Sequence, residues 1–180
     1  MMSRRLFLLA LAALTAGCTT VPLSADSRRY GGRFSMRAAT AEKTETAAGK
    51  YRLTVTGDTY ELTILSPING VLGRVTVTPG LARVERGSRP EITAPTETEL
   101  MREAFGFDLP IAVFADWLEG RPSPLAPSTT ASAAEFTQKD WTVNFTPACP
   151  PDRPAVLKLV RRDPGRLLRF SLTVEKESVL

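Results

Sequence analysis

The sequence contains no histidine and only two cysteines, Cys18 and Cys149, among its 180 residues. Without histidine, Ser-His-Asp and Cys-His catalytic arrangements and zinc sites with imidazole ligands are excluded. Two cysteines are too few for a cysteine-rich metal site or an iron–sulfur cluster. No G-x-S-x-G motif occurs, so the usual signature of a serine hydrolase is missing as well. We therefore expect a protein that is not an enzyme and holds neither a metal ion nor a cofactor.

Basic residues are present but show little clustering. The formal net charge is +4 and the pI is about 9.4, yet no run of Lys and Arg is interleaved with aromatic residues, so we expect no nucleic-acid partner. Hydrophobic residues make up 43% and charged residues 23% of the chain, which is typical of one globular domain. A chain of this length can bury a core without a disulfide or a metal ion.

The N-terminus carries the clearest targeting signal. Arg4 and Arg5 precede an apolar run at residues 6–14, which is too short for a bilayer span of about 20 residues but typical of a signal peptide. Small residues at positions 15–17 stand directly before Cys18. This stretch resembles the lipobox of bacterial lipoproteins, in which the cysteine is lipidated and becomes the mature N-terminus. Thr15 departs from that motif, which usually has Leu there.

We therefore predict a lipoprotein signal peptide at residues 1–17, a lipid anchor at Cys18, a lipidated tether at residues 18–30 and a single domain at residues 31–180. An ordinary signal peptide with an incidental cysteine is the alternative. In Gram-negative lipoproteins, Asp after the lipidated cysteine commonly marks retention at the inner membrane. Thr19 therefore indicates a lipid anchor on the periplasmic face of the outer membrane. Cys149, with no partner left, is predicted to be free and unreactive.

After residue 30 the sequence favours an antiparallel sheet. Apolar and polar residues alternate over many short runs, for example from Tyr51 to Val55 and from Leu168 to Val174, which predicts strands with one buried face. Turn signals such as Asn69-Gly70 and Pro79-Gly80 separate the runs. We expect about nine to eleven strands.

Two short helices interrupt this pattern. Thr96, with Glu99 three residues later, forms a capping box, and Gly106 is placed to end the first helix. Pro110 is predicted to begin the second helix and Gly120 to close it. Residues 121–134, rich in Pro, Ser, Thr and Ala, are expected to form a long loop. The order of elements predicts a mainly β (α+β) fold, with both helices packed across one face of a curved sheet.

The space between the helices and the concave face of the sheet can be interpreted in two ways. A filled core is the simpler one, and a cavity for an apolar ligand is the other. A lipidated protein with no catalytic arrangement acts by binding, which favours the cavity. Period-two alternation and helical spacing predict the residues that line it. These residues are Phe34, Leu53, Leu62, Ile64, Val75, Phe105, Phe114, Trp117, Phe170 and Leu172.

The chain also resembles the LolB family of outer-membrane lipoprotein receptors. The stretches that carry the resemblance lie between residues 31 and 176 and keep the same order. They are Gly32-Arg33-Phe34, Tyr51-Arg52-Leu53, Ser66-Pro67-Ile68-Asn69-Gly70, Leu109-Pro110 through Phe114, Trp117-Leu118, Gly120, Pro122 and Trp141. Residues 38–49 and 121–134 match no part of the family pattern.

The resemblance implies an incomplete antiparallel β-barrel with a helical lid over a hydrophobic cavity. Such a protein accepts acylated lipoproteins from a LolA-like periplasmic carrier and inserts them into the outer membrane. The expected partners are therefore this carrier, the acyl chains of client lipoproteins and outer-membrane lipid, with the protein itself a monomer. Ile68 is expected in an apolar loop that touches the membrane, since the corresponding loop of the family carries an apolar residue.

Other functions remain open at this point. A lipid-anchored scaffold subunit of an envelope assembly machine would have a filled core and would bind its partner on its outer surface. A carrier of another lipid would need the same apolar cavity. The sequence does not distinguish the client lipoproteins.

Overall fold

The computed structural model describes residues 27–147 and 154–175. The strands are β1 (Ser27–Thr40), β2 (Thr44–Thr56), β3 (Thr59–Leu65), β4 (Val71–Thr78), β5 (Leu81–Arg86), β6 (Arg89–Ala94), β7 (Ser128–Ser132), β8 (Glu135–Gln138), β9 (Trp141–Pro147), β10 (Pro154–Asp163) and β11 (Arg166–Thr173). The helices are α1 (Glu97–Phe105) and α2 (Ile111–Trp117).

The eleven strands form one antiparallel sheet that does not close into a barrel. Their order is β6-β5-β4-β3-β2-β1-β11-β10-β9-β8-β7, so β1 lies in the middle and pairs with both β2 and β11. β6 and β7 are the two edges of the sheet, and the chain between them contains both helices. This arrangement confirms the predicted mainly β fold with an incomplete antiparallel barrel.

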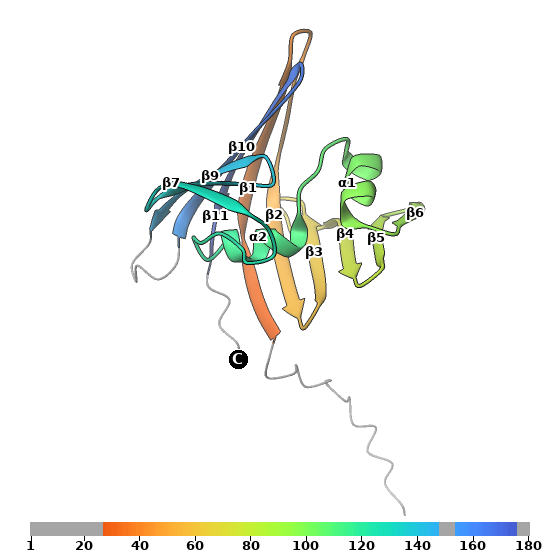
Figure 1. The fold of residues 1–180 in the computed structure, drawn as a ribbon. Coiled ribbons are helices and arrows are strands. Elements are labelled where there is room, and N and C mark those ends of the chain that lie inside the picture. The colour runs from red at the N-terminus through yellow and green to blue at the C-terminus, as the bar shows by residue number, and fades with distance from the viewer. Residues whose placement is uncertain (1–26, 148–153, 176–180) are drawn as a thin grey trace, which may run out of the picture.

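The helices lie over one face of the sheet (Figure 1). α1 contacts β5 and β6, and α2 contacts β3. Thr96 caps α1, because its hydroxyl accepts a hydrogen bond from the Glu99 N–H (3.3 Å), and Gly106 ends the helix at a φ of 74°. Both residues were predicted for these positions, where a capping oxygen and a residue with positive φ are favoured.

The side chain of Glu97, in α1, also caps the N-terminus of α2. Pro110 precedes α2 and provides no side-chain cap. The Glu97 carboxylate accepts a hydrogen bond from the Ala112 N–H (3.2 Å) in the first turn of α2, where helix N–H groups lack partners within the helix. Burial is the main reason why the pKa of Glu97 is raised.

Two segments differ from the predicted layout. β7 lies inside residues 121–134, which were predicted as a loop. Its Ser, Thr and Ala residues are all exposed and show no apolar alternation, yet the strand pairs with β8. β1 begins at Ser27, inside the predicted tether, and the Tyr30 side chain is fully buried. Residues 38–49 form the far end of the β1–β2 hairpin, which rises above the rest of the sheet in Figure 1.

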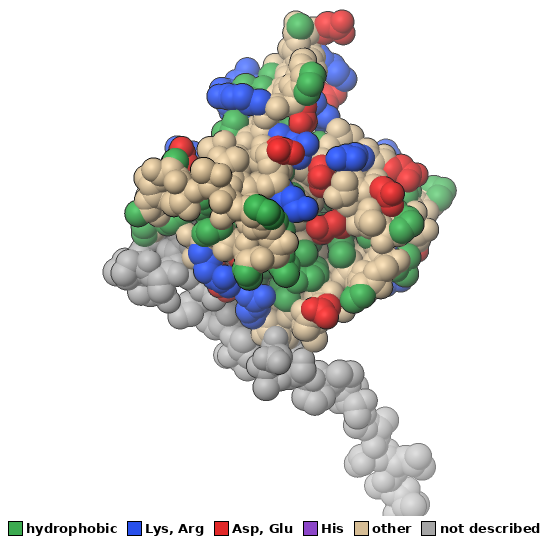
Figure 2. Space-filling view, in the orientation of Figure 1, with side chains coloured by type: hydrophobic (Ala, Val, Ile, Leu, Met, Phe, Trp, Pro, Cys, Tyr) green, Lys and Arg blue, Asp and Glu red, His purple; other side chains and the backbone are tan. Residues whose placement is uncertain are grey.

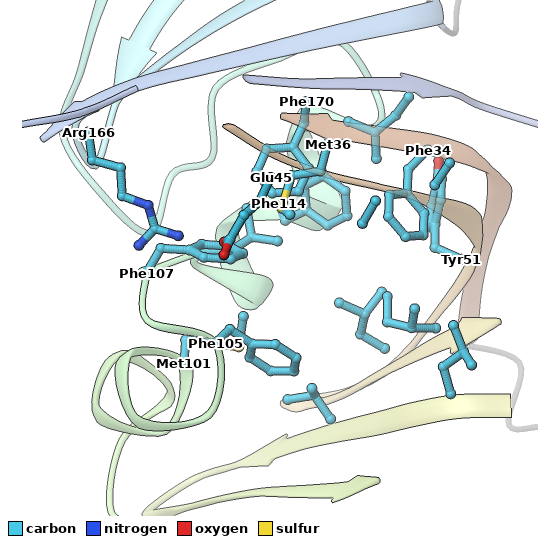
Figure 3. Close-up of a pocket in the computed structure, with 18 residues that line it drawn as sticks. Phe34, Met36, Glu45, Tyr51, Met101, Phe105, Phe107, Phe114, Arg166 and Phe170 are labelled. Carbon is cyan, nitrogen blue, oxygen red and sulfur yellow. The ribbon is translucent and has the colours of Figure 1, made fainter. Parts of the chain in front are cut away.

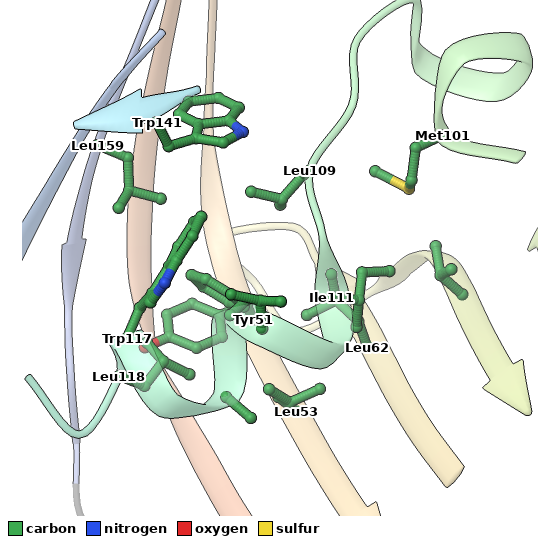
Figure 4. Close-up of a cluster of buried hydrophobic side chains, with 14 of the residues drawn as sticks. Tyr51, Leu53, Leu62, Met101, Leu109, Ile111, Trp117, Leu118, Trp141 and Leu159 are labelled. Carbon is green, nitrogen blue, oxygen red and sulfur yellow. The ribbon is translucent and has the colours of Figure 1, made fainter. Parts of the chain in front are cut away.

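The core is centred on α2 and the strands beneath it (Figure 4). Trp117 and Trp141 are fully buried, and each indole N–H has a partner. The Trp117 Nε1–H donates to Gln138 Oε1 (2.8 Å), and the Trp141 Nε1–H donates to the Asp108 carbonyl (3.0 Å). These hydrogen bonds attach α2 to β8, and β9 to the segment between the helices. In the described part of the chain, neither helix is long and apolar enough to cross a bilayer.

Candidate functional site

An apolar pocket of about 320 Å³ lies between α1 and the concave face of the sheet (Figure 3). Its size lies at the lower end of the range of about 300–1,000 Å³ for small-molecule sites. Sixteen of the eighteen side chains that line it are aliphatic, aromatic or methionine, and the two charged ones are Glu45 and Arg166.

Eight of the ten residues predicted to line a cavity do line this pocket. They are Phe34, Leu62, Ile64, Val75, Phe105, Phe114, Phe170 and Leu172. The cross-strand pairs Phe34–Leu172 and Leu62–Val75 are in register on neighbouring strands, so their side chains share the concave face. Met36 and Met101 also line the pocket, and their flexible thioether side chains can adapt to varied apolar ligands.

Leu53 and Trp117 require a correction, because neither lines the pocket and both are fully buried in the core. The alternation places Leu53 on the correct face of β2, but α2 covers that part of the sheet (Figure 4). Trp117 lies on α2 and is held by Gln138 rather than exposed to the pocket. Periodicity indicates which face a side chain occupies, but not where along the strand the helices fill the space.

Several residues that line the pocket were not predicted from the sequence. Tyr51 belongs to the same alternating run as Leu53, so its spacing was a usable signal. Phe107 and Leu109 come from the irregular segment between the helices, and Ala47 and Ala48 from residues that match no family pattern. None of these four positions belongs to an alternating apolar run, so the sequence pattern gives no sign that tertiary packing brings them to the pocket.

Aromatic rings form much of the pocket wall. Phe107 packs against Phe170 with ring centroids 5.7 Å apart, and Phe114 against Tyr51 at 6.2 Å. The Tyr51 hydroxyl donates a hydrogen bond to the Thr173 carbonyl (3.0 Å). Burial is the main reason why the pKa of Tyr51 lies above its ordinary value, so this phenol is neutral at physiological pH. The Tyr51 hydroxyl therefore has a partner, and the tyrosine contributes to an apolar wall.

Two arginines from opposite halves of the sheet hold the end of α1 over the pocket. Arg86 of β5 donates to the Ala104 carbonyl (2.9 Å), and Arg166 of β11 donates to the Gly106 carbonyl (2.7 Å). The Arg86 guanidinium lies 5.9 Å from the Phe105 ring centroid, and that of Arg166 lies 5.7 Å from the Phe107 ring centroid. Carbonyls at a helix C-terminus lack intrahelical partners, so these contacts fix the position of both phenylalanines.

Charged side chains lie at the outer end of the pocket. Glu45 forms an ion pair with Lys43 (2.7 Å), which together with Arg166 keeps the pKa of Glu45 below its ordinary value. Hydrophobic side chains reach the surface among charged ones on the face that carries the helices, and the projecting hairpins carry both signs of charge (Figure 2). The pocket is therefore apolar inside and charged near its opening.

Ile68 lies at the tip of a tight turn between β3 and β4. The Ser66 N–H donates to the Gly70 carbonyl (2.8 Å), Asn69 has a φ of 67°, and Lys50 Nζ donates to Asn69 Oδ1 (2.8 Å). The Ile68 side chain is 89% exposed. Val71 and Leu72 are exposed as well, and Leu72 also lines the pocket. Exposed apolar residues therefore continue from the pocket to the loop tip.

Cys18, the signal peptide at residues 1–17 and most of the tether lie outside the described residues, as does Cys149.

Comparison with known proteins identifies the family. The model of the family "Outer membrane lipoprotein LolB" matches residues 27–176. The chain belongs to the LolB family. Outer-membrane lipoprotein LolB of Cupriavidus pinatubonensis is 33% identical, with 97% of this chain and 96% of that protein covered. The protein of the same name from Cupriavidus necator is 35% identical over 79% of this chain and 80% of that protein, and that of Bordetella petrii is 28% identical over 92% and 89%.

The LolB match confirms the family resemblance and the predicted class of outer-membrane lipoprotein. It begins at Ser27, where β1 also begins. A crystal structure of a LolA superfamily protein from Nitrosomonas europaea aligns with a TM-score of 0.42 and 11% identity, covering 84% of this chain and 87% of that one.

The end of the family motif, from Trp117 to Gly120, belongs to the core rather than the pocket. Trp117 and Leu118 are fully buried, and Gly120 adopts a φ of 75° where the chain leaves the helix. This end of the motif therefore supports the fold, whereas Leu109 and Phe114 from the same motif line the pocket together with side chains of α1 and several strands.

Proposed function

We propose that this protein accepts acylated lipoproteins from a LolA-like periplasmic carrier, holds their acyl chains in the apolar pocket and inserts them into the outer membrane. The observation that carries the proposal is an open, apolar, aromatic-lined pocket in a member of the LolB family. Each buried methylene contributes about 0.8 kcal/mol, so acyl chains need a dry site when they leave a carrier. No step requires a catalytic residue, a metal or a cofactor.

The proposal is tested by mass spectrometry and by a transfer assay. The purified protein, after incubation with a lipoprotein-loaded carrier, is expected to retain lipoprotein and to release it to outer-membrane lipid vesicles. An acyl ligand that co-purifies would support a carrier role over that of a scaffold subunit. A protein that neither retains lipoprotein nor removes it from the carrier would contradict the proposal. The expected acceptor is a monomer, which light scattering of the purified chain would check.

We also propose that Cys18 is the mature N-terminus and carries the lipid anchor. The support is the arginine pair, the short apolar run and the small residues before it. One acyl chain gives only marginal membrane binding, whereas several anchor stably. Intact-mass analysis of the membrane form should show loss of residues 1–17 and added acyl mass. An unmodified Cys18 would contradict this assignment.

For Ile68 we propose contact with the outer membrane during release. The support is its exposure at the tip of a turn and the apolar residues that continue to the pocket through Leu72. An apolar side chain that is fully buried in a membrane contributes about 1.5–3 kcal/mol. The loop would bring the pocket opening to the bilayer, so that acyl chains leave without crossing water.

A further inference from the structure

Part of β2 has a neighbouring strand on one side only. β2 pairs with β1 from Thr44 onward, but its pairing with β3 starts at Lys50. Residues 44–48 are all exposed. At Gly49 the two strands already approach closely, because an added Cβ would lie 2.4 Å from the Leu65 carbonyl oxygen. We call the unpaired side of residues 44–48 the open edge.

The register shows which backbone groups point toward the open edge. Antiparallel pairs alternate between residues that exchange hydrogen bonds and residues whose N–H and C=O groups point away from each other. The hydrogen bond from the Thr40 N–H to the Lys43 carbonyl (2.8 Å), at the end of the hairpin, sets this alternation. Thr44, Thr46 and Ala48 therefore direct their N–H and C=O groups away from β1. No strand of the described residues pairs with them there, and such groups can template one more strand.

The open edge is also part of the pocket wall. Glu45, Ala47 and Ala48 line the pocket, and Figure 3 shows Glu45 among the lining side chains together with Met36 and Phe107. Ala47 and Ala48 are small and leave space beside the backbone. A peptide whose first residue carries acyl chains in the pocket would therefore start beside the open edge.

We propose that the open edge binds the extended segment that follows the lipidated cysteine of a client lipoprotein, as an added strand. This inference rests on the proposed function. β2 runs from the hairpin tip toward the body of the sheet (Figure 1), so a peptide leaving the pocket toward the tip runs antiparallel to it and continues the order of the sheet. Backbone pairing of this kind places little demand on peptide sequence, which suits a receptor for varied clients.

The experiment uses the purified full chain and three soluble probes. The first is a hexapeptide whose N-terminal cysteine carries one S-hexadecyl chain. The second is the same peptide with every second backbone amide N-methylated. The methylated amides are those that would point toward β2, so the peptide loses the N–H groups that could donate hydrogen bonds to the open edge. The third is S-hexadecyl cysteine without a peptide. We expect the first probe to bind about five- to tenfold more tightly than the second and to slow hydrogen exchange at the Thr44, Thr46 and Ala48 amides.

A matched pair of variants tests the protein side. Thr46→Pro removes one N–H that points away from β1, at a position on an edge where proline is tolerated. We expect it to bind the first probe about three- to tenfold more weakly and to bind the third probe unchanged. Thr46→Ala keeps the N–H and should bind both as the original chain does. If Thr46→Pro does not fold, the N-methylated peptide still tests the original chain.

The outcomes separate this inference from the proposed function. Equal binding of the first two probes, or no protection of the three amides, would overturn the added strand while leaving acyl binding intact. Failure of the third probe to bind would count against the pocket itself. Amide protection that depends on protein concentration without any probe would show that a second copy covers the open edge, and would also overturn the proposal.

Discussion

At the scale of single residues, the pocket depends on side chains that face inward but are not packed against the helices. Ile64 is half-buried and lines the pocket, whereas Leu53 on the neighbouring strand is fully buried. Replacing Ile64 by Trp should fill the pocket and reduce acyl binding at least tenfold, with an overpacking cost of about 1–3 kcal/mol in the free energy of unfolding.

The matched control for Ile64→Trp is Val77→Trp on β4. Val77 is also a half-buried β-branched residue of the sheet, and it does not line the pocket. Titration with S-hexadecyl cysteine would compare the two variants after circular dichroism has confirmed folding. Similar acyl affinity in both variants would contradict the assignment of the pocket.

Ile68 is the residue whose exposure is hardest to explain by folding alone. Ile68→Glu should leave acceptance of lipoprotein unchanged and slow its insertion into vesicles several-fold, because a carboxylate at the tip opposes burial in the bilayer. Accepted lipoprotein should then accumulate on the receptor or its carrier. Leu125→Glu, which also replaces an exposed apolar residue but lies outside this loop, should insert normally. If Ile68→Glu inserted lipoprotein at the rate of the original chain, membrane contact by Ile68 would be contradicted and the loop would act only as a turn.

Prediction from sequence succeeded for residues in regular, half-buried strands. Alternation placed Phe34, Leu62 and Phe170 on the concave face because side-chain direction in a strand has a period of two. It failed for Trp117, since a buried helix residue can face either the core or a pocket with the same spacing. Phe107 lies outside both periodic patterns, and its position depends on its packing against Phe170 and Arg166.

At the scale of elements, the turn that follows α2 and the start of β1 are joined by a small polar network. The Tyr30 hydroxyl donates to the Glu119 carboxylate, Arg121 bonds the same carboxylate (3.0 Å), and Arg28 lies 3.5 Å from it. Burial alone would raise the pKa of Glu119, but the Tyr30 hydrogen bond and the two guanidinium groups lower it overall. The stabilisation from Glu119 is therefore complete above its unfolded-state pKa and is lost as the pH falls through its folded-state value.

Glu119→Gln should accordingly lower the free energy of unfolding at pH 7 by about 1–2 kcal/mol. The difference from the original chain should shrink as the pH falls below the unfolded-state pKa of about 4.3 and through the lower folded-state pKa, where the carboxyl group becomes protonated in both states. Urea unfolding at pH 7 and pH 3 would measure this. Glu61→Gln removes an exposed ion pair with Arg74 (3.4 Å) and should change little at either pH. A loss for Glu119→Gln that is equal at both pH values would contradict this account of the network.

Element prediction was most accurate where capping chemistry supplemented periodicity. Thr96, Glu99 and Gly106 located α1 closely, because caps satisfy particular backbone groups. β7 was not predicted because its exposed Ser and Thr residues have no apolar face, and its pairing with β8 is set by the backbone. The far half of the β1–β2 hairpin was missed for a related reason, since it projects from the sheet and buries little.

At the scale of the whole molecule, β1 belongs to the open sheet from Ser27 onward. Arg28 pairs with Val55 and Tyr30 with Leu53, and the Tyr30 side chain is fully buried. A chain that begins at Gly31, the predicted domain start, should therefore be less stable by about 3 kcal/mol or more than a chain that begins at Ser27, given the cost of removing a buried aromatic side chain. Equal urea midpoints would contradict the boundary at Ser27.

The open form of the barrel was expected from the family resemblance rather than from alternation. Period-two patterns identify strands, but the order in which strands pair, with β1 beside β11 and with β6 and β7 as edges, depends on contacts between residues far apart in sequence. The two helices lie in the connection between these edges, so the unclosed side of the sheet and the cover over the pocket arise from one stretch of chain.

The central claim is that acyl chains of client lipoproteins enter the pocket. Site-specific photo-cross-linking tests it most directly, with p-benzoylphenylalanine in place of Phe170, which lines the pocket, or of Phe145, which does not. After incubation with a lipoprotein-loaded carrier and irradiation, peptide mass spectrometry would locate the adduct. We predict an acyl-chain adduct at position 170 and none at position 145. Lipoprotein transfer without any acyl adduct at position 170, or with equal adducts at both positions, would contradict the claim.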